Sequence, residues 1–117
     1  MPGSSHLNEH EGVRQALIAQ HKAGKRIGAI CAAPMVLAST GILEGKKATC
    51  YPGFEQYFSE NTEYTATLFQ EDGNVITGEG PAATLPYAYK ILSYFAGKET
   101  VAALQDGMMY THLMESK

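Results

Sequence analysis

The sequence has 117 residues, of which 44% are hydrophobic and 18% charged, a composition typical of one folded globular domain. Its net charge of -3 and its nine scattered Lys and Arg residues argue against nucleic acid as a partner. No apolar run approaches the roughly 18 residues of a membrane span, and no signal-peptide pattern opens the sequence, so a cytoplasmic protein is expected.

The first third of the chain predicts a helix, a strand and a second helix. Helical spacing of apolar residues after a capping box at Asn8 predicts a helix over about residues 9 to 23. The short apolar segment 26–31 predicts a strand covered on both faces, as in the middle of a parallel sheet. Pro34 suits a first helical turn and Gly41 a helix stop, so a short helix is expected between them.

The rest of the chain predicts short strands, a hairpin and two helices. Asp72 and Gly73 lie between two β-prone segments and form a hairpin signal. Pro86 is expected to bend its helix near the start. In chain order, the expected elements are a strand over 47–50 closed by Pro52 and Gly53, one or two helical turns after it, strands over 64–70 and 75–77, and helices over 82–95 and 99–110.

This order of elements predicts an α/β layered domain. A doubly wound sheet normally has about five parallel strands, whereas this sequence supplies two strands and a hairpin. Either the architecture is reduced, or strands that precede this sequence are missing from it.

The two cysteines, Cys31 and Cys50, are too few for a disulfide framework and lack the spacing of zinc ligands. The four histidines also lack metal-ligand spacing, so no metal site is expected. Both thiols are therefore expected to be free, and Cys50 is expected to complete a strand.

Cys31 stands where a strand is predicted to end and a helix to begin. A cysteine on such a turn is exposed at the edge of the sheet and lies at the positive end of the helix dipole, which favours a nucleophilic thiolate. The small Ala32 fits a tight turn, and its N–H is a candidate donor to a developing oxyanion. A buried, inert thiol is the alternative, because free cysteine is among the most buried residue types.

A series of short motifs follows in order along nearly the whole chain. The motifs are Met1-Pro2-Gly3 with Leu7, Gly24-Lys25-Arg26-Ile27, Ala29 to Pro34, Leu37, Gly41-Ile42-Leu43, Gly45, Thr49, Pro52, Asp72-Gly73-Asn74, Ile76-Thr77, Gly80-Pro81 and Gly97. In this combination the chain resembles the ThiJ/PfpI superfamily, in particular the branch of the parkinsonism-associated deglycase and its bacterial relatives. The resemblance implies a flavodoxin-like three-layer sandwich with a mostly parallel sheet, on the class I glutamine-amidotransferase-like fold. It also implies that residues 1–117 are a single partial domain, the C-terminal part, incomplete at its N-terminal side.

The resemblance implies a site as well. Cys31 matches the family's nucleophile, and Ala32 matches the second oxyanion donor. The pocket is expected at Tyr51, Gly80 and Pro81. Tyr51 stands where most branches of the family have a histidine, and a phenol is a poor general base at neutral pH.

Two supporting groups of the family, an acidic residue and a glycine, correspond to positions before Met1. Glu79 lies in a turn near the expected pocket, where some relatives have a basic residue, and it is expected to be exposed rather than catalytic. By itself the chain is therefore expected to show little or no turnover.

Three functions are compatible with the sequence. In the first, Cys31 attacks small carbonyl compounds or glycated groups without a cofactor, as in the glyoxalase and deglycase chemistry attributed to relatives. In the second, Cys31 is oxidised to sulfinic acid in a redox-sensing or protective, chaperone-like protein. In the third, the chain is a non-catalytic fragment that associates with itself through a bare sheet edge, so a homodimer is expected.

Overall fold

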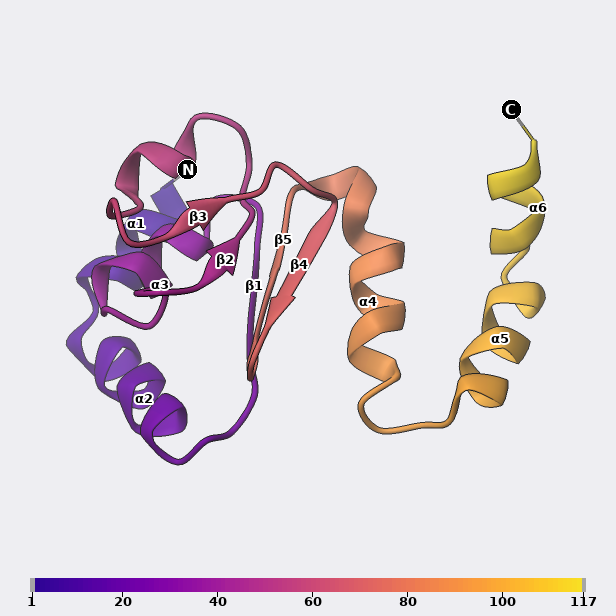
Figure 1. Ribbon diagram of the computed structural model, residues 1–117, viewed down its shortest axis with the longest axis horizontal. Helices are drawn as coiled ribbons and strands as arrows, with labels where there is room; N and C mark the ends of the chain where they lie inside the picture. The colour runs from indigo at the N-terminus through magenta and orange to yellow at the C-terminus, as the bar shows by residue number, and fades with distance from the viewer. Residues whose placement is uncertain (1, 117) are drawn as a thin grey trace. The chain divides into compact units, whose positions relative to one another are not determined.

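The computed structural model describes residues 2–116, and the chain divides into two compact units, one ending at Thr84 and the other beginning at Leu85 (Figure 1). Up to this boundary the elements are α1 (Pro2–Glu9), α2 (Glu11–Lys22), β1 (Ile27–Ile30), α3 (Pro34–Ser39), β2 (Lys47–Ala48), η1 (Phe54–Tyr57), β3 (Glu63–Tyr64), β4 (Phe69–Asp72), β5 (Val75–Gly78) and η2 (Pro81–Ala83). Then follow α4 (Thr84–Leu92), α5 (Lys98–Gly107) and α6 (Tyr110–Glu115). The single domain over 1–117 stays a prediction.

Three strands form the main sheet of the first unit, in the order β1-β5-β4. β1 pairs with β5 in parallel, with Ile27 opposite Val75. β5 pairs with β4 antiparallel, and the turn between them passes through Gly73, whose φ is 61°. A second parallel pair joins β2 and β3. The expected α/β arrangement and the expected hairpin are therefore both present.

β5, rather than β1, lies in the middle of this sheet. All of β5 is buried, whereas β1 alternates between buried and less buried residues, with Gly28 exposed. The prediction that segment 26–31 is covered on both faces is wrong, because only Ile27 and Ala29 point into the core. A short apolar run does not by itself distinguish a strand buried on both faces from one buried on a single face.

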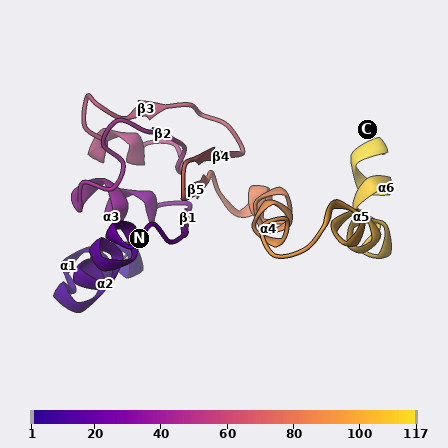
Figure 2. The ribbon, with the colours of Figure 1, turned by 60° about the horizontal axis from the view of Figure 1, so that its bottom comes forward.

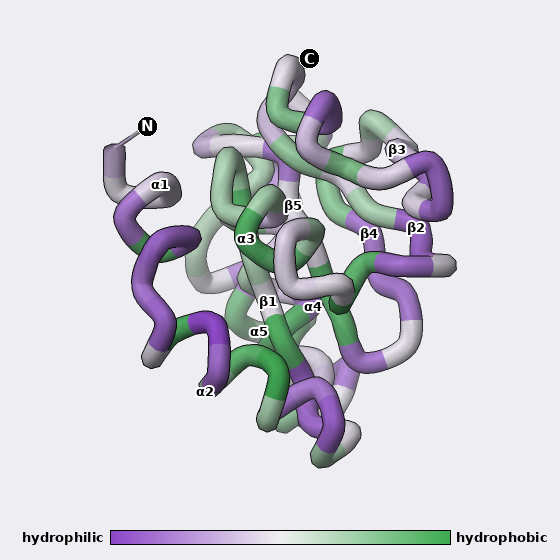
Figure 3. The backbone as a smooth tube through the Cα atoms, turned by 90° about the vertical axis from the view of Figure 1, so that its left-hand side faces the viewer, coloured by the Kyte–Doolittle hydropathy of each residue, from purple (hydrophilic) through white to green (hydrophobic). Residues whose placement is uncertain are grey.

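Helices α1, α2 and α3 lie together on one side of the main sheet in both views of the ribbon (Figures 1 and 2). Along α2 the hydropathy alternates, as expected for a helix with one face on the core, whereas β1 is largely hydrophobic (Figure 3). The core cluster consists of Ile27, Ala29, Leu37, Ile42, Leu43, Ala48 and Val75. Burial of this apolar surface is the main stabilising term of the unit.

The start of α2 differs from the predicted capping box. His10, rather than Asn8, caps the helix, and its Nδ1 accepts a hydrogen bond of 3.2 Å from the N–H of Val13. Asn8 lies inside α1, where its Oδ1 accepts hydrogen bonds from the Arg14 guanidinium and the Ser39 hydroxyl. Asn8 therefore fixes α1 against α2 and α3 instead of starting a helix.

Segment 64–70, predicted as one strand, is divided between the two sheets. β3 ends at Tyr64 and β4 begins at Phe69. Between them Ala66 has a φ of 53°, a left-handed conformation through which a strand does not continue. The β-prone residues on either side of this break therefore pair with different partners.

In the second unit, the helix predicted over 99–110 is present as α5 but ends at Gly107, and a further helix, α6, begins at Tyr110. Met109, with a φ of 61°, separates α5 from α6. Pro86 lies in the first turn of α4, where proline is tolerated because the first N–H groups of a helix have no intrahelical partner. Within residues 2–116, no helix combines the length and the apolar character needed to cross a lipid bilayer.

Candidate active site

Cys31 occupies a sharp turn between β1 and α3. Its φ of 65° is left-handed, and its N–H donates a 3.0 Å hydrogen bond to the carbonyl of Gly78 at the end of β5. The side chain is neither fully buried nor fully exposed. Non-glycine residues rarely adopt this conformation, and where they do it often marks a functional site. The strand–cysteine–helix turn inferred from the sequence is therefore present at the expected residue.

The left-handed backbone at Cys31 costs free energy that glycine would not incur. We expect Cys31→Gly to be more stable than Cys31→Ala by about 1 kcal/mol, because both variants lack the thiol but only alanine keeps the steric strain. Urea unfolding of the two variants measures this difference. Equal stabilities, or a more stable alanine variant, would show that the turn is unstrained.

Ala32 follows the turn and is almost completely buried, with 2% of its surface exposed. The N–H groups on either side of Ala32 already have hydrogen-bond partners, since that of Cys31 donates to the carbonyl of Gly78 and that of Ala33 to the carbonyl of Ile30. The N–H of Ala32 takes part in none of the hydrogen bonds described for residues 2–116. Its position therefore suits the predicted oxyanion donor, a role that stays a prediction.

Tyr51 connects the turn to a cavity. Its N–H donates a 2.8 Å hydrogen bond to the carbonyl oxygen of Cys31. Its ring lies against Gly80, where an added Cβ would come within 3.3 Å of the tyrosine Cδ2. The segment before Tyr51 is anchored to β5. The N–H of the buried Thr49 donates a 2.9 Å hydrogen bond to the hydroxyl of the buried Thr77.

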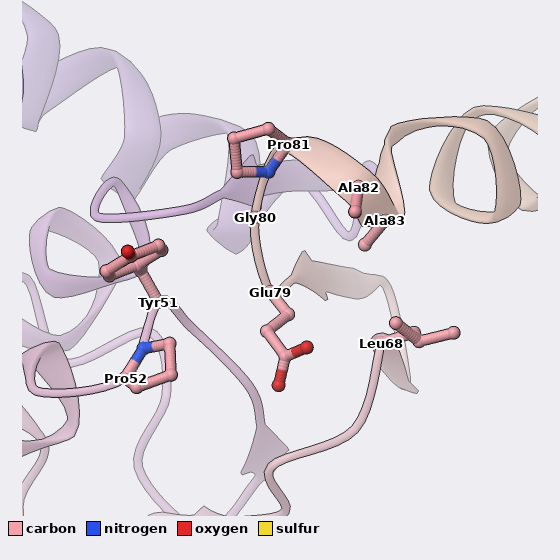
Figure 4. A pocket seen from close by; sticks show the side chains of 8 residues that line it. All are labelled: Tyr51, Pro52, Leu68, Glu79, Gly80, Pro81, Ala82 and Ala83. Carbon is pink, nitrogen blue, oxygen red and sulfur yellow. The ribbon is translucent and has the colours of Figure 1, made fainter.

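The cavity has a volume of about 330 Å³ (Figure 4). It is lined by Tyr51, Pro52, Leu68, Glu79, Gly80, Pro81, Ala82 and Ala83. The structure thus brings together three residues that the sequence places in a pocket, Tyr51, Gly80 and Pro81. Cys31 is adjacent through the Tyr51 hydrogen bond but is not itself a lining residue.

Five lining residues were not assigned to the pocket from the sequence, namely Pro52, Leu68, Glu79, Ala82 and Ala83. Glu79, expected to be exposed, is partly buried and lines the cavity. Leu68 directly precedes β4 and also lines the cavity, and no sequence pattern near it indicates this position. The position of Glu79 directly before Gly80 is the one sequence signal for its role.

Cys50 contrasts with Cys31. Its side chain is fully buried, with 0% exposed. Burial, followed by the charges of Glu55, Cys31 and Glu79, raises the pKa of the Cys50 thiol from 9.0 to about 12. Cys50 is therefore a protonated thiol at neutral pH. It does not complete a strand, as the sequence predicted, because β2 ends at Ala48.

The raised pKa of Cys50 predicts an alkaline loss of stability. The unfolded chain loses the thiol proton near pH 9.0, whereas the folded chain keeps it until about pH 12. The contribution to the free energy of unfolding is therefore complete below pH 9 and declines as the pH rises toward 12. We expect urea unfolding to show a shallower alkaline decline for Cys50→Ala than for the unmodified chain, and parallel declines would contradict the assignment.

The described residues contain no group of three or more His, Cys, Asp or Glu side chains arranged to hold a metal ion. Of the side chains that line the cavity, Tyr51 supplies a phenol and Glu79 a carboxylate. The expectation that no cofactor takes part stays a prediction.

Comparison with known proteins places this chain in a family. Residues 1–94 match the model described as the DJ-1/PfpI family. The chain is 37% identical over 111 residues to Protein dj-1beta of Drosophila melanogaster, covering 94% of this chain and 59% of that protein. It is 34% identical over 104 residues to the glutathione-independent glyoxalase DJR-1.2 of Caenorhabditis elegans, covering 88% and 55%.

The solved structures that resemble this chain come from the same family as its sequence relatives. The crystal structure of Drosophila melanogaster DJ-1beta has a TM-score of 0.87 and 37% identity, covering 93% of this chain and 59% of that one. Oxidized DJ-1 of Toxoplasma gondii has a TM-score of 0.84 and 27% identity, with the same coverage of 93% and 59%. The chain thus spans somewhat more than half the length of these relatives. With its flavodoxin-like α/β fold, it belongs to the DJ-1/PfpI family.

Proposed function

We propose that this chain carries the carbonyl-reactive site of a glyoxalase or deglycase of the DJ-1 type, with Cys31 as the nucleophile. The observation that carries the proposal is the left-handed turn at Cys31, a partly exposed residue whose carbonyl oxygen accepts a hydrogen bond from the N–H of Tyr51, a residue that lines the cavity. The relative named as a glutathione-independent glyoxalase supports the reaction class.

In the proposed first step, the Cys31 thiolate adds to the aldehyde carbon of a 2-oxoaldehyde such as methylglyoxal. A carbon–sulfur bond forms, and the π electron pair of the carbonyl moves to its oxygen, which accepts a hydrogen bond from the N–H of Ala32. Protonation of this oxygen gives a hemithioacetal, a step that requires no oxidant and no cofactor. The proton is the one that the Cys31 thiol releases when it ionises. Glu79 is the lining side chain that can accept and return it, and the Tyr51 phenol can donate a hydrogen bond.

Mass spectrometry of the intact chain after incubation with methylglyoxal tests this step. We expect one reversible adduct, lost in Cys31→Ala and retained in Cys50→Ala. Modification of lysine and arginine side chains serves as the internal control, because it occurs equally in all three proteins. Adduct formation that survives in Cys31→Ala, or that needs Cys50, would contradict the proposal.

A second candidate function is redox sensing through Cys31. It is favoured by the contrast between the two thiols, because only Cys31 is accessible, and by the oxidized state named for the Toxoplasma gondii relative. In this reaction a thiolate takes one oxygen atom from each of two peroxide molecules, giving sulfinate and two waters. After mild peroxide treatment we expect sulfinic acid at Cys31 and none at Cys50. Oxidation of both residues to the same extent would rule out a selective sensor.

We also propose a cytoplasmic homodimer. Within residues 2–116, β1 pairs with a strand on one side only, and alternate residues such as Gly28 direct their backbone groups to the other side. Unpaired backbone groups of this kind promote association. Light scattering is expected to give the mass of a dimer, and a monodisperse monomer would contradict it.

A further inference from the structure

The cavity beside Cys31 has an apolar wall with one charged side chain. Pro52, Leu68 and Pro81 are among its apolar lining residues, and Glu79 supplies its carboxylate. None of the lining residues is Lys, Arg or His. In Figure 4 the Glu79 carboxylate extends away from Gly80 into the space between Pro52 and Leu68.

A second carboxylate adds to the negative charge of this region. Glu55 accepts hydrogen bonds of 3.0 and 2.8 Å from the N–H of Gly53, the residue after Pro52. Burial is the largest cause that raises the pKa of Tyr64, and the charges of Glu55 and Glu79 both raise it further. The two carboxylates therefore act on the same part of the first unit.

Partial burial makes the charge of Glu79 more effective than an exposed charge. Its side chain is half-buried, so water and salt screen it less than they screen a surface carboxylate. A volume of about 330 Å³ accommodates a small organic ligand. The aliphatic part of such a ligand, its stem, would pack on the apolar wall. A cation at the end of such a stem gains an ion pair, whereas an anion meets repulsion.

We infer that Glu79 makes this cavity select ligands with a positive charge, an alkylammonium or guanidinium group on a short aliphatic stem, over anionic ligands. The inference rests on the proposed function, because it names the class of carbonyl compound that reaches Cys31. That class consists of carbonyl compounds that also bear an alkylammonium or guanidinium group. Anionic 2-oxo acids belong to the disfavoured class.

Charged thiol reagents of matched size test the inference on the chain itself. Cys31 attacks the sulfenyl sulfur of an ethyl methanethiosulfonate, forming a disulfide and releasing methanesulfinate, and the ethyl group carries either trimethylammonium or sulfonate. The ratio of the cationic to the anionic rate is measured in the Cys50→Ala background, so that only Cys31 reacts, for the native chain and for the chain in urea. At low ionic strength we expect the native ratio to exceed the unfolded ratio by about tenfold.

Variants assign this preference to Glu79. Glu79→Gln is expected to lower the native ratio several-fold, and Glu79→Lys to invert it. Glu44→Gln is the matched control, because Glu44 is exposed, lies outside the cavity lining and gives the same change in net charge. A native ratio equal to the unfolded ratio, or a ratio that Glu79→Gln leaves unchanged, would overturn the inference.

A binding measurement separates failure of this inference from failure of the proposed function. Butylammonium and butyrate are titrated into the chain while the amide signals of Gly80 and Ala83 are followed by NMR. We expect butylammonium to shift these signals at lower concentration, and Glu79→Gln to remove the difference. If Cys31 reacts with neither reagent, the proposed function fails, and the titration still decides the charge preference. Equal titration curves for the two ligands would overturn the inference.

Discussion

Alkylation of the native chain with iodoacetamide at about pH 8 is expected to modify Cys31 alone, and Cys31→Ala is expected to slow the uptake of label at least about 100-fold. Cys50 is fully buried, and its pKa is about 12. At this pH only about one Cys50 thiol in 10⁴ is ionised, and the thiolate is the reactive form. Peptide mapping by mass spectrometry identifies the modified residue.

Two comparisons make this prediction specific. Cys50→Ala is expected to take up label at the rate of the unmodified chain, and in concentrated urea both cysteines are expected to react. Label in the Cys50 peptide of the native chain, or uptake by Cys31→Ala within tenfold of the unmodified rate, would contradict the contrast between the two thiols.

Replacing Thr77 by valine is expected to lower the free energy of unfolding by about 2 kcal/mol. The Thr77 hydroxyl, with 0% of the residue exposed, accepts a 2.9 Å hydrogen bond from the N–H of Thr49, which is equally buried. Valine has the same shape but no acceptor, so the N–H of Thr49 is left unpaired away from water. Urea unfolding measures the loss.

Thr65→Val provides the control for this substitution. The Thr65 hydroxyl bonds to the Thr67 hydroxyl at an exposed site, where water replaces the lost partner, and its second hydrogen bond, to the carbonyl of Ala48, is long at 3.4 Å. A change within about 0.5 kcal/mol is therefore expected. Thr77→Val is also expected to speed the alkylation of Cys50, because Thr49 is the neighbour that anchors this segment. Equal destabilisation by the two substitutions would show that the buried hydrogen bond is unimportant.

The elements with strong local signals could be predicted from the sequence. Pro34 and Gly41 mark the ends of α3 correctly, and Gly73 marks the hairpin. The breaks at Ala66 and Met109 could not be predicted, because neither residue type favours a positive φ. Helix α1 was also missed, since its place depends on packing against α3 rather than on its own periodicity.

The site was predictable only where a local pattern or the family resemblance indicates a residue. Cys31 lies in a strand–turn–helix pattern that can be recognised along the chain, and Tyr51, Gly80 and Pro81 follow from family resemblance. Glu79 was misjudged, because a residue between two glycines in a turn is usually exposed. Its partial burial arises from segments distant in sequence, which no local pattern reveals.

Protection of Cys31 by a carbonyl compound is the most direct test of the central claim, that the thiol on this turn meets its carbonyl substrate in the adjacent cavity. The rate of alkylation by iodoacetamide is measured with increasing methylglyoxal, and Cys50→Ala ensures that only Cys31 reports. We predict that alkylation slows in a saturable way and recovers when methylglyoxal is removed. An alkylation rate that methylglyoxal leaves unchanged would contradict the claim.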